Sequence, residues 1–98
     1  MSTPLYQLKA EFFKTLGHPA RIRVLELLGQ REYAVSELLP EVGLEATNLS
    51  QHLAVLRRAG LVVQGRGRLY QIPKQYLSAP GERVADFGHC LLRLDAGA

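Results

Sequence analysis

The stretch 46–63, ATNLSQHLAVLRRAGLVV, decides the fold of this chain. Because a helix turns by about 100° per residue, Leu49, Leu53 and Leu56 fall on one apolar stripe. The opposite side carries short hydrogen-bonding groups first and arginines last: Thr47, Asn48, Ser50, Gln51, Arg57 and Arg58. Such a face suits a helix that meets base edges with its first turns and phosphates with its end. The alternative interpretation is an ordinary amphipathic helix whose solvent face lacks acids.

A β-hairpin is expected directly after this helix. Two β-prone runs, 61–63 and 69–72, flank the loop Gly65-Arg66-Gly67-Arg68, and Pro73 ends the second run. A hairpin in this position is the wing of a winged helix. The two arginines are expected at its tip.

Helices are also expected over 5–16, 19–28 and 37–42, where apolar residues recur at helical spacing. A short third helix, a turn at Gly43 and a longer polar-faced helix make a helix-turn-helix.

Local signals set the bounds of these helices. Pro19 suits the first turn of the second helix, which makes His18 a neighbour of its cap or a solvent-exposed residue. Gly29 ends that helix, and Ser36 is a natural cap for the third. Tyr33, in the connector between them, is placed for a strand-like pairing.

A last helix is expected over 82–94, because apolar residues recur there at spacings of three and four. The predicted fold class is therefore mainly α with a small β-hairpin: one winged helix-turn-helix domain over 1–98 with about five helices. Within it, 36–59 form the helix-turn-helix and 61–73 the wing. The segments 1–17 and 82–95 form dimerisation helices.

The two terminal helices carry more apolar surface than one small domain is expected to cover, and a patch of that kind usually marks an interface. A homodimer is therefore expected. Its interface is assigned to Leu5, Leu8, Phe12, Phe13, Phe87, Leu91 and Leu94.

Composition narrows the function classes. The 98 residues hold 12 Lys and Arg against 9 Asp and Glu, for a net charge of +3. Five of the cations lie between Arg57 and Lys74, where there is no acid, and this is the charge distribution expected of a polyanion binder. One cysteine excludes an internal disulfide and a cysteine-cluster zinc site. With no signal peptide or membrane span in the sequence, a cytoplasmic protein is expected.

At the level of motifs, FFKTLGHPARIRVLELL followed by VSELLPEVGLEATNLSQHLAVLRRAGLV resembles the ArsR-type bacterial repressors, which are winged helix proteins similar to the arsenic repressor. The resemblance covers roughly residues 8 to 72. It implies a homodimer that binds an imperfect palindrome in double-stranded DNA, commonly releases it when a small effector binds, and uses its first and last helices for dimerisation.

The same resemblance assigns base reading to Thr47, Ser50 and Gln51, with Asn48 and His52 as neighbours. Arg66 and Arg68 fall in the wing, which in the family reaches the DNA backbone or minor groove. This wing departs from the family pattern because its loop is a few residues shorter.

The family's effector sites are not reproduced. Its thiol motif falls on Ala34 and Ser36, and neither residue can supply the thiolate that a soft metal ion needs. Its other site, on the last helix, falls on Asp86, His89 and Cys90, an incomplete ligand set. No metal and no cofactor are therefore expected, and Cys90 is expected to be a small buried residue.

Two other classes of function fit the residues less well. A winged helix that docks on another protein would more often expose large apolar side chains on its polar-faced helix. An enzyme is not expected, because the sequence has no nucleophile–base pair, phosphate loop or paired carboxylates in a suitable context. A sequence-specific DNA-binding regulator, most simply a repressor, fits the residues best.

Overall fold

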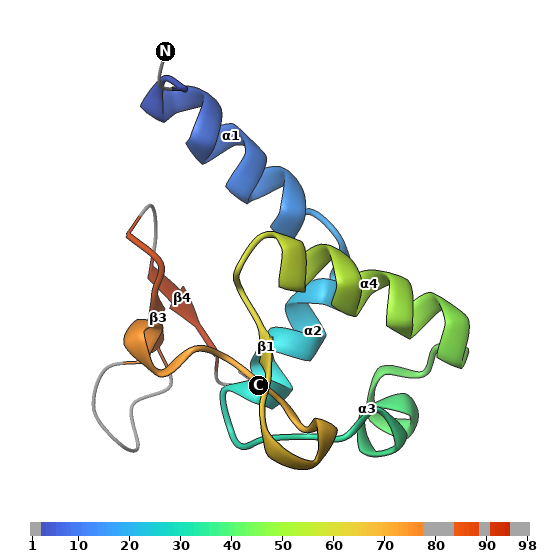
Figure 1. Ribbon diagram of the computed structural model, residues 1–98. Coiled ribbons are helices and arrows are strands. Elements are labelled where there is room, and N and C mark those ends of the chain that lie inside the picture. Colours follow the sequence, from blue (N-terminus) through green and yellow to red (C-terminus); the bar gives the residue numbers. More distant parts are fainter. Residues whose placement is uncertain (1–2, 78–83, 89–90, 95–98) are drawn as a thin grey trace.

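The computed structural model describes residues 3–77, 84–88 and 91–94. Its helices are α1 (Leu5–Leu16), α2 (Pro19–Leu28), α3 (Val35–Val42) and α4 (Ala46–Arg58). Its strands are β1 (Val63–Gln64), β2 (Tyr70–Gln71), β3 (Val84–Asp86) and β4 (Leu91–Arg93), with short 3-10 turns at Arg66–Arg68 and Lys74–Tyr76. The helices α2, α3 and α4 pack together, and α1 extends away from them (Figure 1). The winged helix-turn-helix is confirmed, with four α-helices in the described residues instead of about five.

The α2 helix has the bounds that its sequence predicts, because both ends carry strong local signals. His18 is its N-cap, and the imidazole Nδ1 accepts a hydrogen bond from the backbone N–H of Ala20 at 3.1 Å. Pro19 occupies the first turn, where a missing N–H leaves nothing unpaired. At the other end, the N–H of Gly29 donates to the carbonyl oxygen of Leu25 at 2.9 Å.

The α3 helix begins earlier than expected, so the assignment of Ser36 as its cap is wrong. The N-cap is Ala34, whose backbone is extended, and Ser36 lies inside the first turn. Glu37 supplies the capping contact, because its Oε1 accepts a hydrogen bond from the Ala34 N–H at 2.9 Å. Gly43 then ends the helix with φ of 77°, a left-handed conformation that favours glycine.

The α4 helix is the second helix of this helix-turn-helix, and it buries its apolar stripe completely. Leu49, Leu53 and Leu56 are 0–1% exposed, in one core with Val24, Leu25 and Leu38. The helix ends in a two-bond motif: Leu61 N–H donates to the Leu56 carbonyl oxygen, and Gly60 N–H donates to that of Arg57, both at 2.9 Å. This motif turns the chain into the wing.

The wing is a two-stranded antiparallel hairpin in which Val63 pairs with Gln71 and Gln64 with Tyr70. The strand-like pairing expected of Tyr33 is confirmed, because Tyr33 and Tyr70 exchange two backbone hydrogen bonds of 3.1 and 2.7 Å. The connector before α3 therefore pairs with the wing at one residue, in the manner of a third strand. Pro73 lies just beyond the second strand, as expected.

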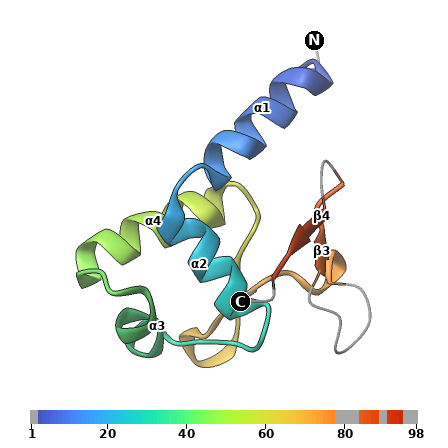
Figure 2. The ribbon, with the colours of Figure 1, turned by 180° about the vertical axis from the view of Figure 1, so that it is seen from behind.

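The expected last helix is not formed. Within the segment 82–94, the described residues make the antiparallel hairpin β3–β4, in which Ala85 pairs with Leu92. The Asp86 carboxylate accepts a hydrogen bond from the Gly88 N–H at 2.9 Å, and Gly88 has φ of 87°, so this turn interrupts any helix there. Figure 2 shows the hairpin on the side of α2 opposite to α3.

The described part of the chain contains no helix that is both long enough and apolar enough to span a bilayer.

Candidate nucleic-acid interface

The outer face of α4 is a row of exposed, short polar side chains. Thr47, Asn48, Ser50 and Gln51 are all exposed, while the leucines on the opposite side are fully buried. A shallow, open hollow of about 430 Å³ lies on this face, and its lining residues are Ala46, Thr47, Ser50, Gln51 and Ala54. The small alanine side chains at its edges leave the hydroxyl and amide groups accessible. Such groups can donate to and accept from the edges of bases.

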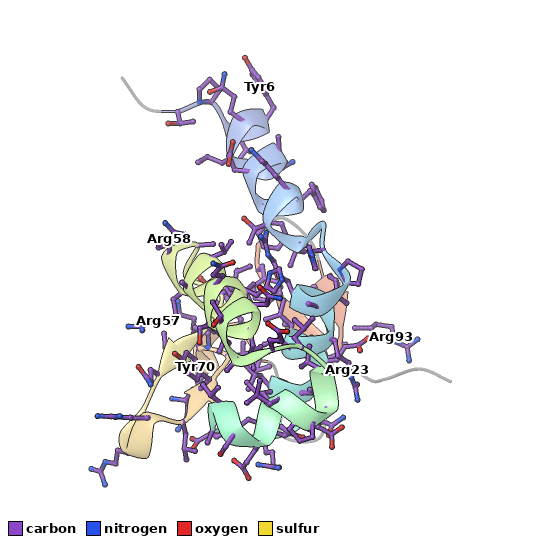
Figure 3. The ribbon with its side chains drawn as sticks, turned by 90° about the vertical axis from the view of Figure 1, so that its right-hand side faces the viewer. Tyr6, Arg23, Arg57, Arg58, Tyr70 and Arg93 are labelled. Carbon is purple, nitrogen blue, oxygen red and sulfur yellow. The ribbon has the colours of Figure 1, made fainter. Side chains whose placement is uncertain are left out.

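Cations border this face. Arg57 and Arg58 are exposed in the last turn of α4, and Arg66 and Arg68 are exposed at the tip of the wing. In Figure 3, Arg57 and Arg58 project on the side of the molecule toward which the wing extends, and Arg23 lies on the opposite side. A second hollow, lined by Ala54, Arg57 and Arg58, shares Ala54 with the first, so the polar face of α4 continues into these two arginines.

The tip of the wing has an unusual backbone. Gly67 and Arg68 both lie in the left-handed region, with φ of 66° and 61°. For a residue with a side chain this conformation costs about 1–2 kcal/mol. The loop is closed by a hydrogen bond from the Gly65 N–H to the Leu69 carbonyl oxygen at 2.8 Å. The resulting turn holds both arginine side chains in solvent.

His52 differs from the other residues expected to bind DNA because it is half-buried. Its Nδ1 accepts a hydrogen bond from the Arg21 Nε–H at 3.2 Å, and its ring lies 4.2 Å from that of His18. Burial, and then the charges of His18 and Arg21, hold the pKa of His52 below its ordinary value.

Sequence reasoning missed Arg21. Because Arg21 follows the N-cap His18 by one helical turn, the sequence indicates a contact between Arg21 and His18 and no other. The contact with His52 joins residues 31 positions apart.

A second polar cluster connects α3 to the wing. The Arg31 guanidinium lies 3.7 Å from the centre of the Tyr33 ring and donates to the Glu37 carboxylate at 3.3 Å. The Ala34 N–H, and then the charge of Arg31, lower the pKa of Glu37. Because Tyr33 pairs with Tyr70, this cluster fixes the wing relative to the helix-turn-helix.

The residues assigned to a dimer interface separate into two groups. Phe87 and Leu94 are buried in the core of their own chain, and Phe12 is half-buried with its ring 5.4 Å from that of Phe87. The chain therefore covers more of its apolar surface than its sequence suggests. The others are 45–68% exposed: Leu5, Leu8, Phe13 and Leu91.

The weak metal-site candidate loses its geometric basis. Asp86 lies on a strand, with its carboxylate turned to the Gly88 N–H, and not on the helix that the site would require. His89 and Cys90 lie outside the described residues. Among the residues that the structure describes, no three His, Cys, Asp or Glu side chains are grouped to hold a metal ion.

Comparisons with known proteins agree with this geometry. Residues 18–63 match the family model described as bacterial regulatory protein, arsR family. An HTH-type transcriptional regulator of Mycobacterium tuberculosis is 63% identical over 75 residues, or 72% of this chain and 66% of that protein. This chain therefore matches slightly less than two thirds of that regulator's length.

Two solved structures have a similar fold. A crystal structure from M. tuberculosis superposes with a TM-score of 0.64 at 63% identity, covering 72% of this chain and 75% of that one. The transcriptional repressor BigR from Xylella fastidiosa superposes with a TM-score of 0.63 at 35% identity, covering 66% and 67%.

Proposed function

Because this chain belongs to the arsR family of bacterial regulatory proteins, we propose that it is a homodimeric repressor that binds an imperfect palindrome in double-stranded DNA. This family consists of transcriptional regulators and not of enzymes, which agrees with the sequence analysis. In this proposal the front turns of α4 enter the major groove, and the arginines of α4 and of the wing contact phosphates.

The observation that carries the proposal is the division of α4 into two faces. Its apolar stripe is fully buried, so the helix is rigidly held. Its outer face presents Thr47, Ser50 and Gln51 around an open hollow, with arginines at the helix end. A helix that docks on a protein would expose larger apolar groups there. Hydrogen-bonding groups with cations beside them match the chemistry of a DNA groove.

The exposed apolar face of α1 supports the dimer. Leu5, Leu8 and Phe13 are 45–58% exposed on a helix whose one buried residue is Leu16. A second copy of the chain would cover them and would present a second α4 to the next half-site, one helical turn of DNA away. An effector that releases the DNA is part of the proposal, and its chemistry is left open.

Fluorescence anisotropy on the DNA upstream of the chain's own gene tests the reading face. Gln51→Ala and Thr47→Ala should each weaken specific binding by about 1–3 kcal/mol and leave binding to a scrambled duplex nearly unchanged. Gln75→Ala, at an exposed glutamine after the wing, is the matched control. Equal loss on both duplexes would instead assign these residues to the DNA backbone.

Sedimentation equilibrium tests the dimer. Phe13→Glu should convert a micromolar dimer into a folded monomer, because it places a charge in the proposed contact. Val63→Glu, at an exposed apolar residue of the wing, should leave the dimer intact. A wild-type chain that sediments as a monomer would contradict the dimer and the palindromic operator together.

A further inference from the structure

One guanidinium joins three helices behind the proposed reading face. Arg21 on α2 donates from Nε to Nδ1 of His52 on α4 at 3.2 Å. It also donates from Nη1 to the carbonyl oxygen of Thr15, in the last turn of α1, at 3.1 Å. The end of the protruding helix α1 and the middle of α4 are thereby connected through one side chain.

The direction of these hydrogen bonds fixes where the protons lie on the two histidines. Arginine has only donors, so Nδ1 of His52 must accept, and a neutral ring then carries its proton on Nε2. The His18 ring contacts His52 with ring centres 4.2 Å apart and planes tilted by 48°, and its own Nδ1 accepts from the Ala20 N–H. The charged or titratable groups that act on His52 are His18, in the α1–α2 connection, and Arg21; the neighbouring residue from α1, Thr15, is uncharged.

We propose that Arg21 is a positioning residue for α4: it holds His52 as the neutral tautomer with its proton on Nε2, and it fixes α4 to the end of α1. Nε2–H is then the one donor that the His52 ring keeps for an acceptor on DNA. The consequence for DNA rests on the function proposed above, whereas the tautomer does not.

Long-range ¹H–¹⁵N spectra of the full chain test the tautomer without DNA. In the wild type, the His52 signals should show an unprotonated Nδ1 and a protonated Nε2. Arg21→Met should give a mixture of tautomers and raise the pKa of His52, because a donor and a nearby positive charge are lost. Arg23→Met is the matched control, since Arg23 is on the same helix but pairs with Glu26 and Glu41. A wild-type His52 protonated on Nδ1, or a pKa unaffected by Arg21→Met, would overturn the proposal.

Binding to operator DNA tests the positioning role. Arg21→Met should weaken specific binding about fivefold, the usual effect of one lost hydrogen bond, and Arg23→Met by less than twofold. In a His52→Ala background, Arg21→Met should have no further effect, because the two residues act as one unit. If Arg21→Met does not fold, Arg21→Lys serves instead, because it keeps the charge but lacks the planar Nε–H.

The outcomes separate the two proposals. The positioning role would be refuted, and the repressor left intact, if the wild type binds DNA specifically but Arg21→Met weakens binding no more than Arg23→Met does. The same holds if the effect of Arg21→Met adds fully to that of His52→Ala. No specific DNA binding by the wild type would refute the repressor, and the spectra would still decide the tautomer.

Discussion

The helices α1 and α4 are nearly equal in length, with 12 and 13 residues, and both are amphipathic, yet they use their faces in opposite ways. The α4 helix buries all three leucines of its stripe and exposes its polar side. The α1 helix buries only Leu16 and exposes Leu5, Tyr6, Leu8 and Phe13. Amphipathic spacing alone therefore does not show what a helix packs on. The core of the same chain covers the apolar face of α4, whereas most of the apolar face of α1 stays exposed, and in the proposed dimer a second copy would cover it.

The largest difference between the two helices is expected when one leucine in each is truncated to alanine. Leu53→Ala should destabilise the chain by about 2–5 kcal/mol, because it leaves a cavity in a fully packed core. Leu5→Ala, at 58% exposure, should change the stability of a monomer by less than about 0.5 kcal/mol. Urea unfolding at low and high protein concentration measures both, and the Leu5→Ala effect should grow with concentration if α1 is an interface. Equal effects at low concentration would show that α1 packs on its own chain.

A smaller effect is expected at Gly29, which determines whether the terminal hairpin can cover its side of the core. A Cβ added there would lie 2.7 Å from Cβ and Cδ1 of Leu94, which is fully buried. Gly29→Ala should therefore destabilise the chain by about 1–3 kcal/mol through overpacking. At an unhindered site with this backbone the same change would stabilise by about 0.4–1 kcal/mol.

Limited proteolysis of Gly29→Ala should show faster cleavage in the β3–β4 hairpin. Displacement of this hairpin would also expose Phe12 on α1, because the Phe12 ring contacts that of Phe87. A more stable Gly29→Ala variant would mean that the hairpin does not pack at this position.

The wing tests whether the reading face extends beyond α4. If the wing contacts phosphates in a symmetric dimer, Arg66→Ala should remove two of these contacts, so the logarithmic salt slope of DNA binding should fall by about 2. All sequences should be weakened alike. Arg68→Gly should remove the same charge and, because the left-handed backbone is retained without its strain, raise stability by about 1 kcal/mol. An unchanged salt slope for both variants would leave recognition to α4 alone.

The smallest effect is expected from Glu37, which supports α3 and the wing but not α1. Because the folded-state pKa of Glu37 is lowered, its contribution to stability is present above the ordinary value of 4.5 and is lost as pH falls through the lower folded value. The stability difference between the wild type and Glu37→Gln should therefore shrink as pH falls below 4.5. Glu32→Gln is the control. A difference that stays constant with pH would show that the carboxylate is not charged in its capping role.

The parts of the fold that were predicted correctly are those set by neighbouring residues. The bounds of α2 follow from His18, Pro19 and Gly29, and the buried stripe of α4 follows from three leucines. The spacing of Val84, Phe87, Leu91 and Leu94 also fits a helix, but the turn at Asp86 and Gly88 outweighs it locally. A spacing of three or four residues between apolar side chains does not distinguish a short helix from two short strands joined by a glycine turn.

The candidate site was predictable in its exposed part only. The polar row of α4 can be found from helical geometry, because which side faces out depends on the positions of the leucines. The junction of His18, Arg21 and His52 depends on how α2 crosses α4, and no local signal contains that information. Arg68 illustrates the same limit, because its left-handed backbone is a property of the closed loop.

Hydroxyl-radical footprinting of the full chain on the DNA upstream of its gene tests the central claim, that the outer face of α4 reads DNA from a dimer. The account predicts two protected half-sites about 10 base pairs apart, centre to centre, with Gln51→Ala losing both protections while still binding random duplex at low salt. A single protected site, or protection that Gln51→Ala leaves unchanged, would contradict it.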